Sequence, residues 1–134
     1  MSDAAPRPIR FVRALIEPSP DQHCQALVQI ERRGSGLSTG TAKGGCSEPD
    51  VLRTVARATA DAVSVAFTTE RVVVRIRGVQ QVEAFAQTIV VVSLIASRGG
   101  NTQTLLGVCD VASDPARGVA LAVLNGTNRF LGRG

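Results

Sequence analysis

The chain has 134 residues, a formal net charge of +4 and 44% hydrophobic residues, which fits one domain that buries a core without metal or disulfide staples. Its aromatic residues are limited to four phenylalanines, so stacking on nucleic-acid bases is not expected. The longest apolar run, residues 89–95, is too short to span a bilayer, and residues 1–10 lack the apolar core of a signal peptide. We therefore expect a cytoplasmic protein that does not contact membranes.

Cysteine usage gives no sign of a cross-linked or metal-bound fold. Cys24, Cys46 and Cys109 are odd in number and far apart, and none belongs to a Cys-x-x-Cys pair. We expect reduced thiols, no disulfide framework, no metal site and no cofactor.

The first half of the chain is predicted to contain three strands and a helix after a disordered arm at residues 1–8. Apolar and polar residues alternate in the segments that we place as strands: 9–17, 25–33 and 37–42. Gly34-Ser-Gly36 is expected to form the turn between the last two strands. Ser47 as N-cap and Pro49 in the first turn then open an amphipathic helix that ends near Thr68.

The second half repeats this order of elements. Strands are predicted over 71–79, 88–96 and 102–111, and Ser113-Asp114-Pro115 opens a second amphipathic helix. The predicted fold class is therefore α+β, with a single domain over 9–134. It consists of two tandem βββα units, about 9–69 and 70–134, with mostly antiparallel sheets and helices packed on one face.

Two features of the predicted strands carry hypotheses about partners. Residues 88–96 are apolar on both faces, which indicates either a strand covered on two sides or one buried against a second copy, and hence a homodimer or higher homo-oligomer. Arg71, Arg75 and Arg77 alternate with valine and isoleucine and are expected on one solvent face. They form either a solvated face or a patch that binds a polyanion such as nucleic acid.

Nucleophilic catalysis is a further hypothesis. Cys46 lies just before a predicted helix start, where backbone amides and the helix dipole favour a thiolate. His23 is the one histidine that could act as its base, and no third orienting residue is evident. A small thiol enzyme around Cys46 and His23 is kept as an alternative.

The two helix openings are the remaining candidates for a site. Gly44-Gly45-Cys46-Ser47 and residues 110–113 each offer free N–H groups beside flexible backbone, which suits a carboxylate or another small anion. Plain helix capping is the alternative interpretation.

Element order and two phrases, TGTAKGGCSEPD and GVCDVASDPARGVALAVLNGTNRFL, carry a family resemblance over nearly the whole chain after residue 8. The chain resembles the regulatory, dimerising domain of isopropylmalate synthase, as a free-standing copy. The resemblance implies that an end-product amino acid binds near a subunit interface and regulates a separate catalytic domain. Carried over by position, the implied pocket consists of five residues: Gly44, Gly45, Asp50, Gly107 and Asp110.

Together these observations predict a non-enzymatic regulatory or protein-interaction module that oligomerises and binds a small metabolite such as an amino acid. A protein partner is expected to receive its effect. The alternatives are a nucleic-acid-binding protein that uses the arginine-rich sheet face, and the thiol enzyme.

Overall fold

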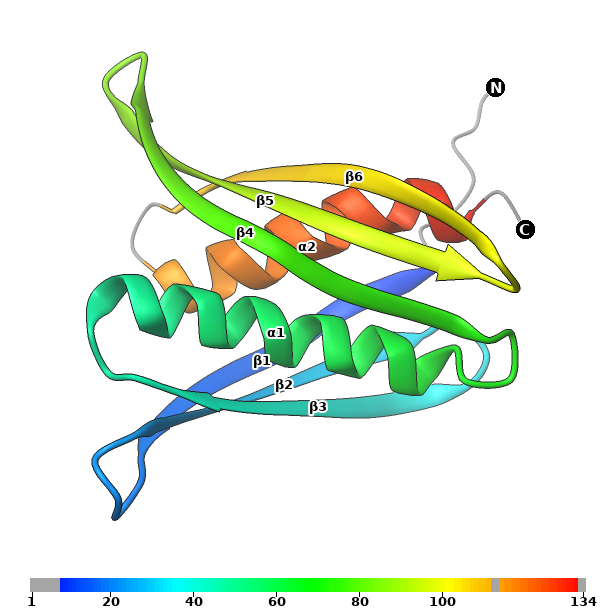
Figure 1. Ribbon diagram of the computed structural model, residues 1–134, viewed down its shortest axis with the longest axis horizontal. Helices are drawn as coiled ribbons and strands as arrows, with labels where there is room; N and C mark the ends of the chain where they lie inside the picture. Colours follow the sequence, from blue (N-terminus) through cyan, green and yellow to red (C-terminus); the bar gives the residue numbers. More distant parts are fainter. Residues whose placement is uncertain (1–7, 112–113, 133–134) are drawn as a thin grey trace.

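The chain folds as two βββα units in series (Figure 1). The computed structural model describes residues 8–111 and 114–132. The elements of the first unit are β1 (Ile9–Pro18), β2 (Cys24–Arg32), β3 (Gly36–Gly44) and α1 (Glu48–Ala66). Those of the second unit are β4 (Val72–Ala84), β5 (Gln87–Arg98), β6 (Asn101–Asp110) and α2 (Pro115–Leu131). The strands form two antiparallel sheets, β1-β2-β3 and β4-β5-β6, which confirms the predicted fold class.

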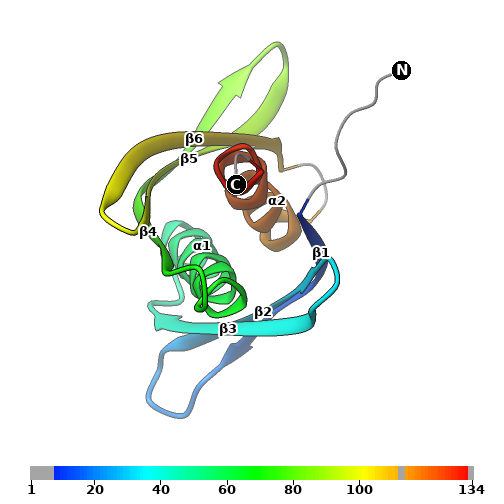
Figure 2. The ribbon, with the colours of Figure 1, turned by 90° about the vertical axis from the view of Figure 1, so that its right-hand side faces the viewer.

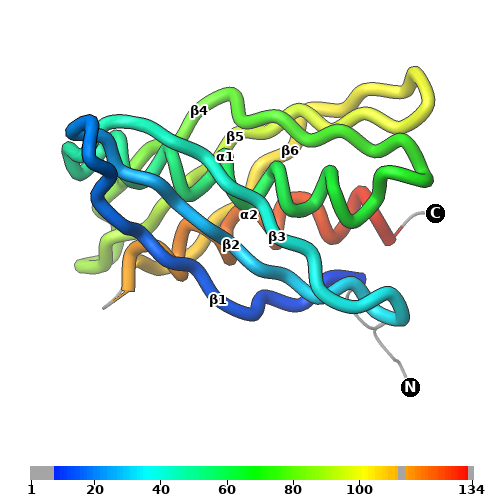
Figure 3. Tube along the Cα trace, turned by 90° about the horizontal axis from the view of Figure 1, so that it is seen from below, coloured from blue at the N-terminus to red at the C-terminus, as the bar shows by residue number. Residues whose placement is uncertain are grey.

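Both helices lie between the two sheets, side by side and running in the same direction (Figures 1 and 2). Helix α1 packs on β2 and β3 and reaches across to β4, whereas α2 packs on β5 and β6 and reaches across to β1. Figure 3 shows the β1-β2-β3 sheet in front of the helices. The inward residues of the middle strands are fully buried and supply the centre of one continuous core: Val28, Ile30, Val90, Val92 and Leu94.

The helix starts follow the capping chemistry of the sequence. Ser47 caps α1 by accepting a hydrogen bond from the Asp50 amide at 3.3 Å, and Pro49 lies in the first turn. Asp114 caps α2 by accepting from the Arg117 amide at 3.1 Å. The proposed contribution of Ser113 lies outside the described residues. No helix in the described part of the chain has the length and apolar character needed to cross a membrane.

A glycine in each third strand sets the distance between sheet and helix. A Cβ on Gly40 of β3 would lie 2.0 Å from the Ala58 carbonyl oxygen of α1. A Cβ on Gly107 of β6 would lie 1.8 Å from the Ala122 carbonyl oxygen of α2. Both distances are far below van der Waals contact, so only glycine allows the strand backbone to lie directly on the helix.

The two units also end their helices in the same way. At the end of β2, Arg32 stacks 3.9 Å from the centre of the Phe67 ring and donates to the Ala66 carbonyl at 2.8 Å. At the end of β5, Arg98 lies 5.3 Å from the Phe130 ring centre and 3.5 Å from the Leu131 carbonyl. Each guanidinium thus complements the negative end of a helix and covers an aromatic ring, which supports a true internal repeat.

The second unit differs from its prediction in the length of its first hairpin. Strand β4 continues to Ala84, beyond the predicted end at residue 79, with a register shift between Ile76 and Gly78. The turn to β5 consists of Phe85 and Ala86, both at positive φ, 53° and 61°. Such a turn normally calls for asparagine or glycine, so the sequence carried no signal for it. The arm predicted for residues 1–8 lies, except for Pro8, outside the described residues.

We predict that Gly40→Ala lowers the free energy of unfolding by about 3 kcal/mol, because the added methyl group forces β3 away from α1. Thr41→Ala is the control, since Thr41 is the next residue of the same strand and its side chain is exposed on the outer face of the sheet. The control should change stability by less than about 1 kcal/mol. Urea unfolding followed by circular dichroism measures both, and equal midpoints for the two variants would contradict the close-approach argument.

Candidate interaction surfaces

The outer face of the β4-β5-β6 sheet carries a group of apolar side chains among polar ones such as Arg75 and Gln80, and no described element covers it. On β6, the side chains of Leu106 and Val108 are 63% and 46% exposed. The register places Leu106 beside Ser93 and Gly78, and Val108 beside Val91, so these residues form one continuous surface across the strands. Further apolar residues extend this surface, which we call the apolar sheet face: Val73, Val82, Ile89 and Ile95.

The outer face of the β1-β2-β3 sheet is more polar, although Leu15 and Leu37 on it are 42% and 59% exposed. Arg10 and Glu31 form an ion pair at 2.7 Å, and Arg13 donates to Gln29 at 2.7 Å. Gln29 in turn donates to Thr39 on the third strand at 3.2 Å. Linked polar side chains therefore cross all three strands of this face. The prediction that residues 88–96 form a strand apolar on both faces is confirmed, with only the inner face buried by helices.

The first helix opening contains a disulfide, which corrects the prediction of reduced thiols. Cys24, at the start of β2, is bonded to Cys46, just before α1, with the two Cα atoms 5.2 Å apart. Cys109 is the free cysteine of the described chain. The thiol that the enzyme hypothesis needs is therefore engaged in a covalent bond, and the thiol-based argument for a reducing compartment is lost. The prediction failed because the antiparallel pairing of β2 with β3 places Cys24 beside Gly44, two residues before Cys46, which spacing alone does not reveal.

His23 directly precedes Cys24, the disulfide partner of Cys46, but its side chain belongs to a polar cluster at the tip of the β1-β2 hairpin. Its Nδ1 atom is 3.5 Å from the Asp21 carboxylate, which also pairs with Lys43 at 2.9 Å. Hydrogen bonds from Ser19 and then Lys43 hold the pKa of the Asp21 carboxyl well below its usual range. The Asp21–Lys43 pair joins the hairpin to the end of β3, so the cluster ties the same two segments as the disulfide.

The structure places the five residues of the implied ligand pocket in two groups. In the first group, the space beside Gly45 is filled by the Asp50 carboxylate, 2.4 Å from where a Cβ would lie, and that beside Gly44 by Thr54. In the second, Gly107 packs against α2 in the middle of β6, and Asp110 ends that strand. Gly44, Gly45 and Asp50 are thus brought together, whereas the position of Gly107 is explained by packing.

The three arginines proposed for polyanion binding do not share one strand surface. Arg71 precedes β4 in a turn at φ 60°, and Arg77 sits at the register shift of that strand. Arg75 is exposed and faces outward beside Ile95. These residues border the apolar sheet face, so polyanion binding stays a prediction.

Helix side chains bond to the free edge of β3. The Thr41 amide donates to Asp61 Oδ2 at 3.1 Å, and the Lys43 carbonyl accepts from Arg57 Nη2 at 3.0 Å. Both partners come from α1. The edge of the first sheet that faces α1 is therefore blunted against pairing with another strand.

The edges of the second sheet are engaged in the same manner. On β4, the Val74 amide donates to Ser64 Oγ at 3.0 Å, and on β6 the Val108 carbonyl accepts from Asn125 Nδ2 at 3.1 Å. Strand β1 is the remaining edge strand. Among the described residues, no helix side chain is hydrogen-bonded to its backbone.

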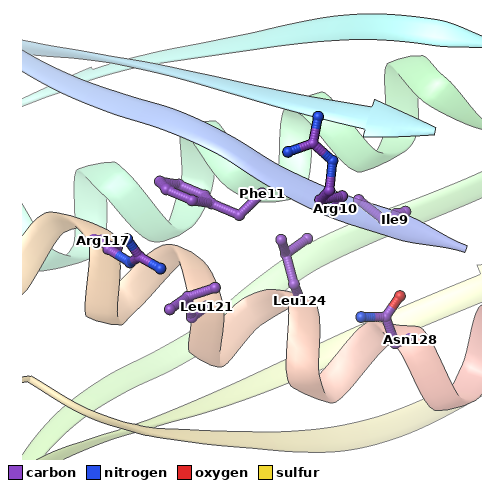
Figure 4. A pocket seen from close by; sticks show the side chains of 7 residues that line it. All are labelled: Ile9, Arg10, Phe11, Arg117, Leu121, Leu124 and Asn128. Carbon is purple, nitrogen blue, oxygen red and sulfur yellow. The ribbon is translucent and has the colours of Figure 1, made fainter. Parts of the chain in front are cut away.

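A groove of about 420 Å³ lies between this edge of β1 and helix α2 (Figure 4). Consecutive residues of β1 line one wall: Ile9, Arg10 and Phe11. Four residues of α2 line the other: Arg117, Leu121, Leu124 and Asn128. Sequence reasoning missed this groove because its two walls come from opposite ends of the chain.

Comparison with models of protein families gives no match, and comparison with curated protein sequences gives none either. The assignments of surfaces and sites therefore rest on the residues of this chain.

We predict that reduction of the disulfide lowers the free energy of unfolding by about 3 kcal/mol, because the cross-link restricts the unfolded chain. Urea unfolding with and without a phosphine reductant measures the change. Cys46→Ser should abolish the effect of the reductant, and Cys109→Ala should preserve it. Identical unfolding curves for the wild-type protein in both conditions would show that the bond contributes no stability.

Proposed function

We propose that this protein is a non-enzymatic interaction module that assembles as a homodimer through its apolar sheet face. The observation that carries the proposal is the contrast between two related surfaces of one molecule. The outer face of β1-β2-β3 carries an ion pair and linked polar side chains beside the exposed Leu15 and Leu37, and that of β4-β5-β6 carries exposed Val73, Leu106 and Val108 with partly buried valine and isoleucine around them. An exposed apolar surface of this kind is a recurrent mark of protein association.

A second copy of the chain fits this face for steric and electrostatic reasons. Gly78 and Ser93 lie side by side in the middle row of the face, so no large side chain holds a second sheet away there. The charged residue Arg75 lies on the edge strand β4, away from this centre. Self-pairing about a two-fold axis therefore brings apolar surface onto apolar surface without opposing like charges in the middle.

The proposal includes a regulatory role in which a small metabolite, such as an amino acid, binds at the first helix opening. Support comes from the resemblance to the isopropylmalate synthase regulatory domain and from the grouping of Gly44, Gly45 and Asp50 at the start of α1. Helices α1 and α2 begin at the same end of the molecule (Figure 1). A ligand there would bind at the end of the molecule where both helices start, and a protein partner would read out its presence.

Light scattering coupled to size exclusion tests the assembly. We expect a dimer of the wild-type chain and a monomer of Leu106→Glu, because a carboxylate in the buried interface cannot be solvated. Leu37→Glu is the matched control, since Leu37 is 59% exposed on the outer face of the other sheet. That variant should remain dimeric. A monomeric wild-type protein, or equal behaviour of the two variants, would contradict the proposed interface.

Thermal shift in the presence of each amino acid tests the sensing role separately. A ligand at a hundredfold excess over its Kd should stabilise the native protein by about 2.7 kcal/mol. The Asp50→Asn variant should lose this response while remaining dimeric. A dimer whose melting temperature responds to no amino acid at millimolar concentration would contradict the sensing role. The proposed dimer interface would be unaffected by that result.

A further inference from the structure

We propose that the free edge of β1, together with helix α2, binds an extended acidic peptide segment of a partner protein by strand addition. The inference goes beyond the self-association of the apolar sheet face, because it concerns a different surface. It rests on the comparison of the four sheet edges and on the groove between β1 and α2.

Each helix meets the edge strand of the other unit at a seam, and the two seams differ in their hydrogen bonds. Helix α1 reaches across to β4, and there Ser64 Oγ accepts a hydrogen bond from the Val74 amide. Helix α2 reaches across to β1 in the same way, with Asn128 facing the strand. The Asn128 Oδ1 atom is buried and has no hydrogen-bond partner. A buried acceptor without a donor costs free energy, so this seam lacks an N–H group that the other seam has.

The groove has a shape that suits an extended chain. Its wall on the β1 side is made by successive residues, which means that the backbone edge itself faces the space. An extended peptide beside β1 would continue the antiparallel or parallel pairing of the sheet and would offer amide donors toward α2. Phe11, Leu121 and Leu124 form an apolar floor for alternate side chains of such a peptide (Figure 4).

The length of the groove argues against a single small metabolite as its occupant. Arg117 and Asn128 occupy opposite ends of the α2 wall. At 1.5 Å per helical residue, their separation along the axis is about 16 Å. About five residues of extended chain, at roughly 3.3 Å each, cover this distance, whereas a free amino acid does not.

Charge selects an acidic peptide. The Arg117 guanidinium lies 5.6 Å from the centre of the Phe11 ring, at one end of the groove, and forms no ion pair with a described residue. Arg10 on the opposite wall is already paired with Glu31, so Arg117 is the cation that the groove offers, in a chain of formal charge +4. A carboxylate near Arg117 therefore gains a hydrogen-bonded cationic partner.

The test is an NMR titration of the isotope-labelled full chain with the peptide acetyl-Glu-Val-Thr-Val-Glu-amide, up to about 1 mM. We expect saturable shifts at the amides of Ile9 to Phe11 and of α2. The lysine counterpart, acetyl-Lys-Val-Thr-Val-Lys-amide, should bind at least fivefold more weakly, on the order expected for reversal of a charge contact. Equal binding of the two peptides, or shifts confined to other surfaces, would overturn the proposal.

Two variants locate the contacts. Arg117→Gln should weaken binding of the acidic peptide by about tenfold, and Arg129→Gln, an exposed change on the same helix outside the groove, should leave it unchanged. Asn128→Leu should weaken binding and leave thermal stability unchanged or higher, because it removes an unpartnered buried acceptor. Unchanged affinity in both groove variants would refute the assignment.

Two further probes separate strand addition from other modes of occupancy. Peptides that are N-methylated on one or the other set of alternate residues lose backbone donors, and at least one set should abolish binding. Retained binding by both would exclude strand addition. Sodium octanoate, an apolar carboxylate without amide groups, should leave the groove amides unshifted. Octanoate binding without peptide binding would make the groove a small-molecule site and overturn the proposal.

Discussion

The architecture depends on the direct contact of strand backbone with helix backbone at two glycines. Gly40 lies on Ala58 and Ala62 of α1, and Gly107 lies on Ala122 and Gly126 of α2. Two helices fit between two sheets only because each has sunk onto its own sheet at these points, which leaves room for it to touch the edge strand of the other unit. Larger side chains on either partner would separate the layers and open the shared core.

The two units use the same devices and depart from each other at a few positions. Both stack an arginine on a phenylalanine at the helix end, and both bond a helix side chain to the third strand, through Asp61 and Asn125. A disulfide and an Arg32–Glu70 ion pair, in which the guanidinium lowers the pKa of the Glu70 carboxyl, have no counterpart among the described residues of the second unit. We infer binding roles from the features in which the two units differ, because the features that both units share are explained by folding.

The fold was largely predictable from the sequence, and the surfaces were predictable only in part. Alternation and capping residues located all the strands and helices because those signals act over a few neighbouring positions. The extension of β4 was missed because its turn uses Phe85, 98% exposed, in place of glycine. The disulfide and the β1–α2 groove were missed because they join segments that only the folded chain brings together. Gly107 was interpreted through a resemblance, whereas its packing contact accounts for its position.

The unequal outer faces bear on how such a molecule reaches a finite size. An ancestral chain with one βββα unit would make the same body from two identical halves, and both outer sheets would then be alike. If both outer sheets were apolar, every molecule would have an association surface at each end, and molecules would stack into assemblies of unlimited size. Fusion of the halves into one polypeptide allows each outer sheet to mutate independently. In the proposed dimer, the more polar outer face of β1-β2-β3 would then end the association after one pairing.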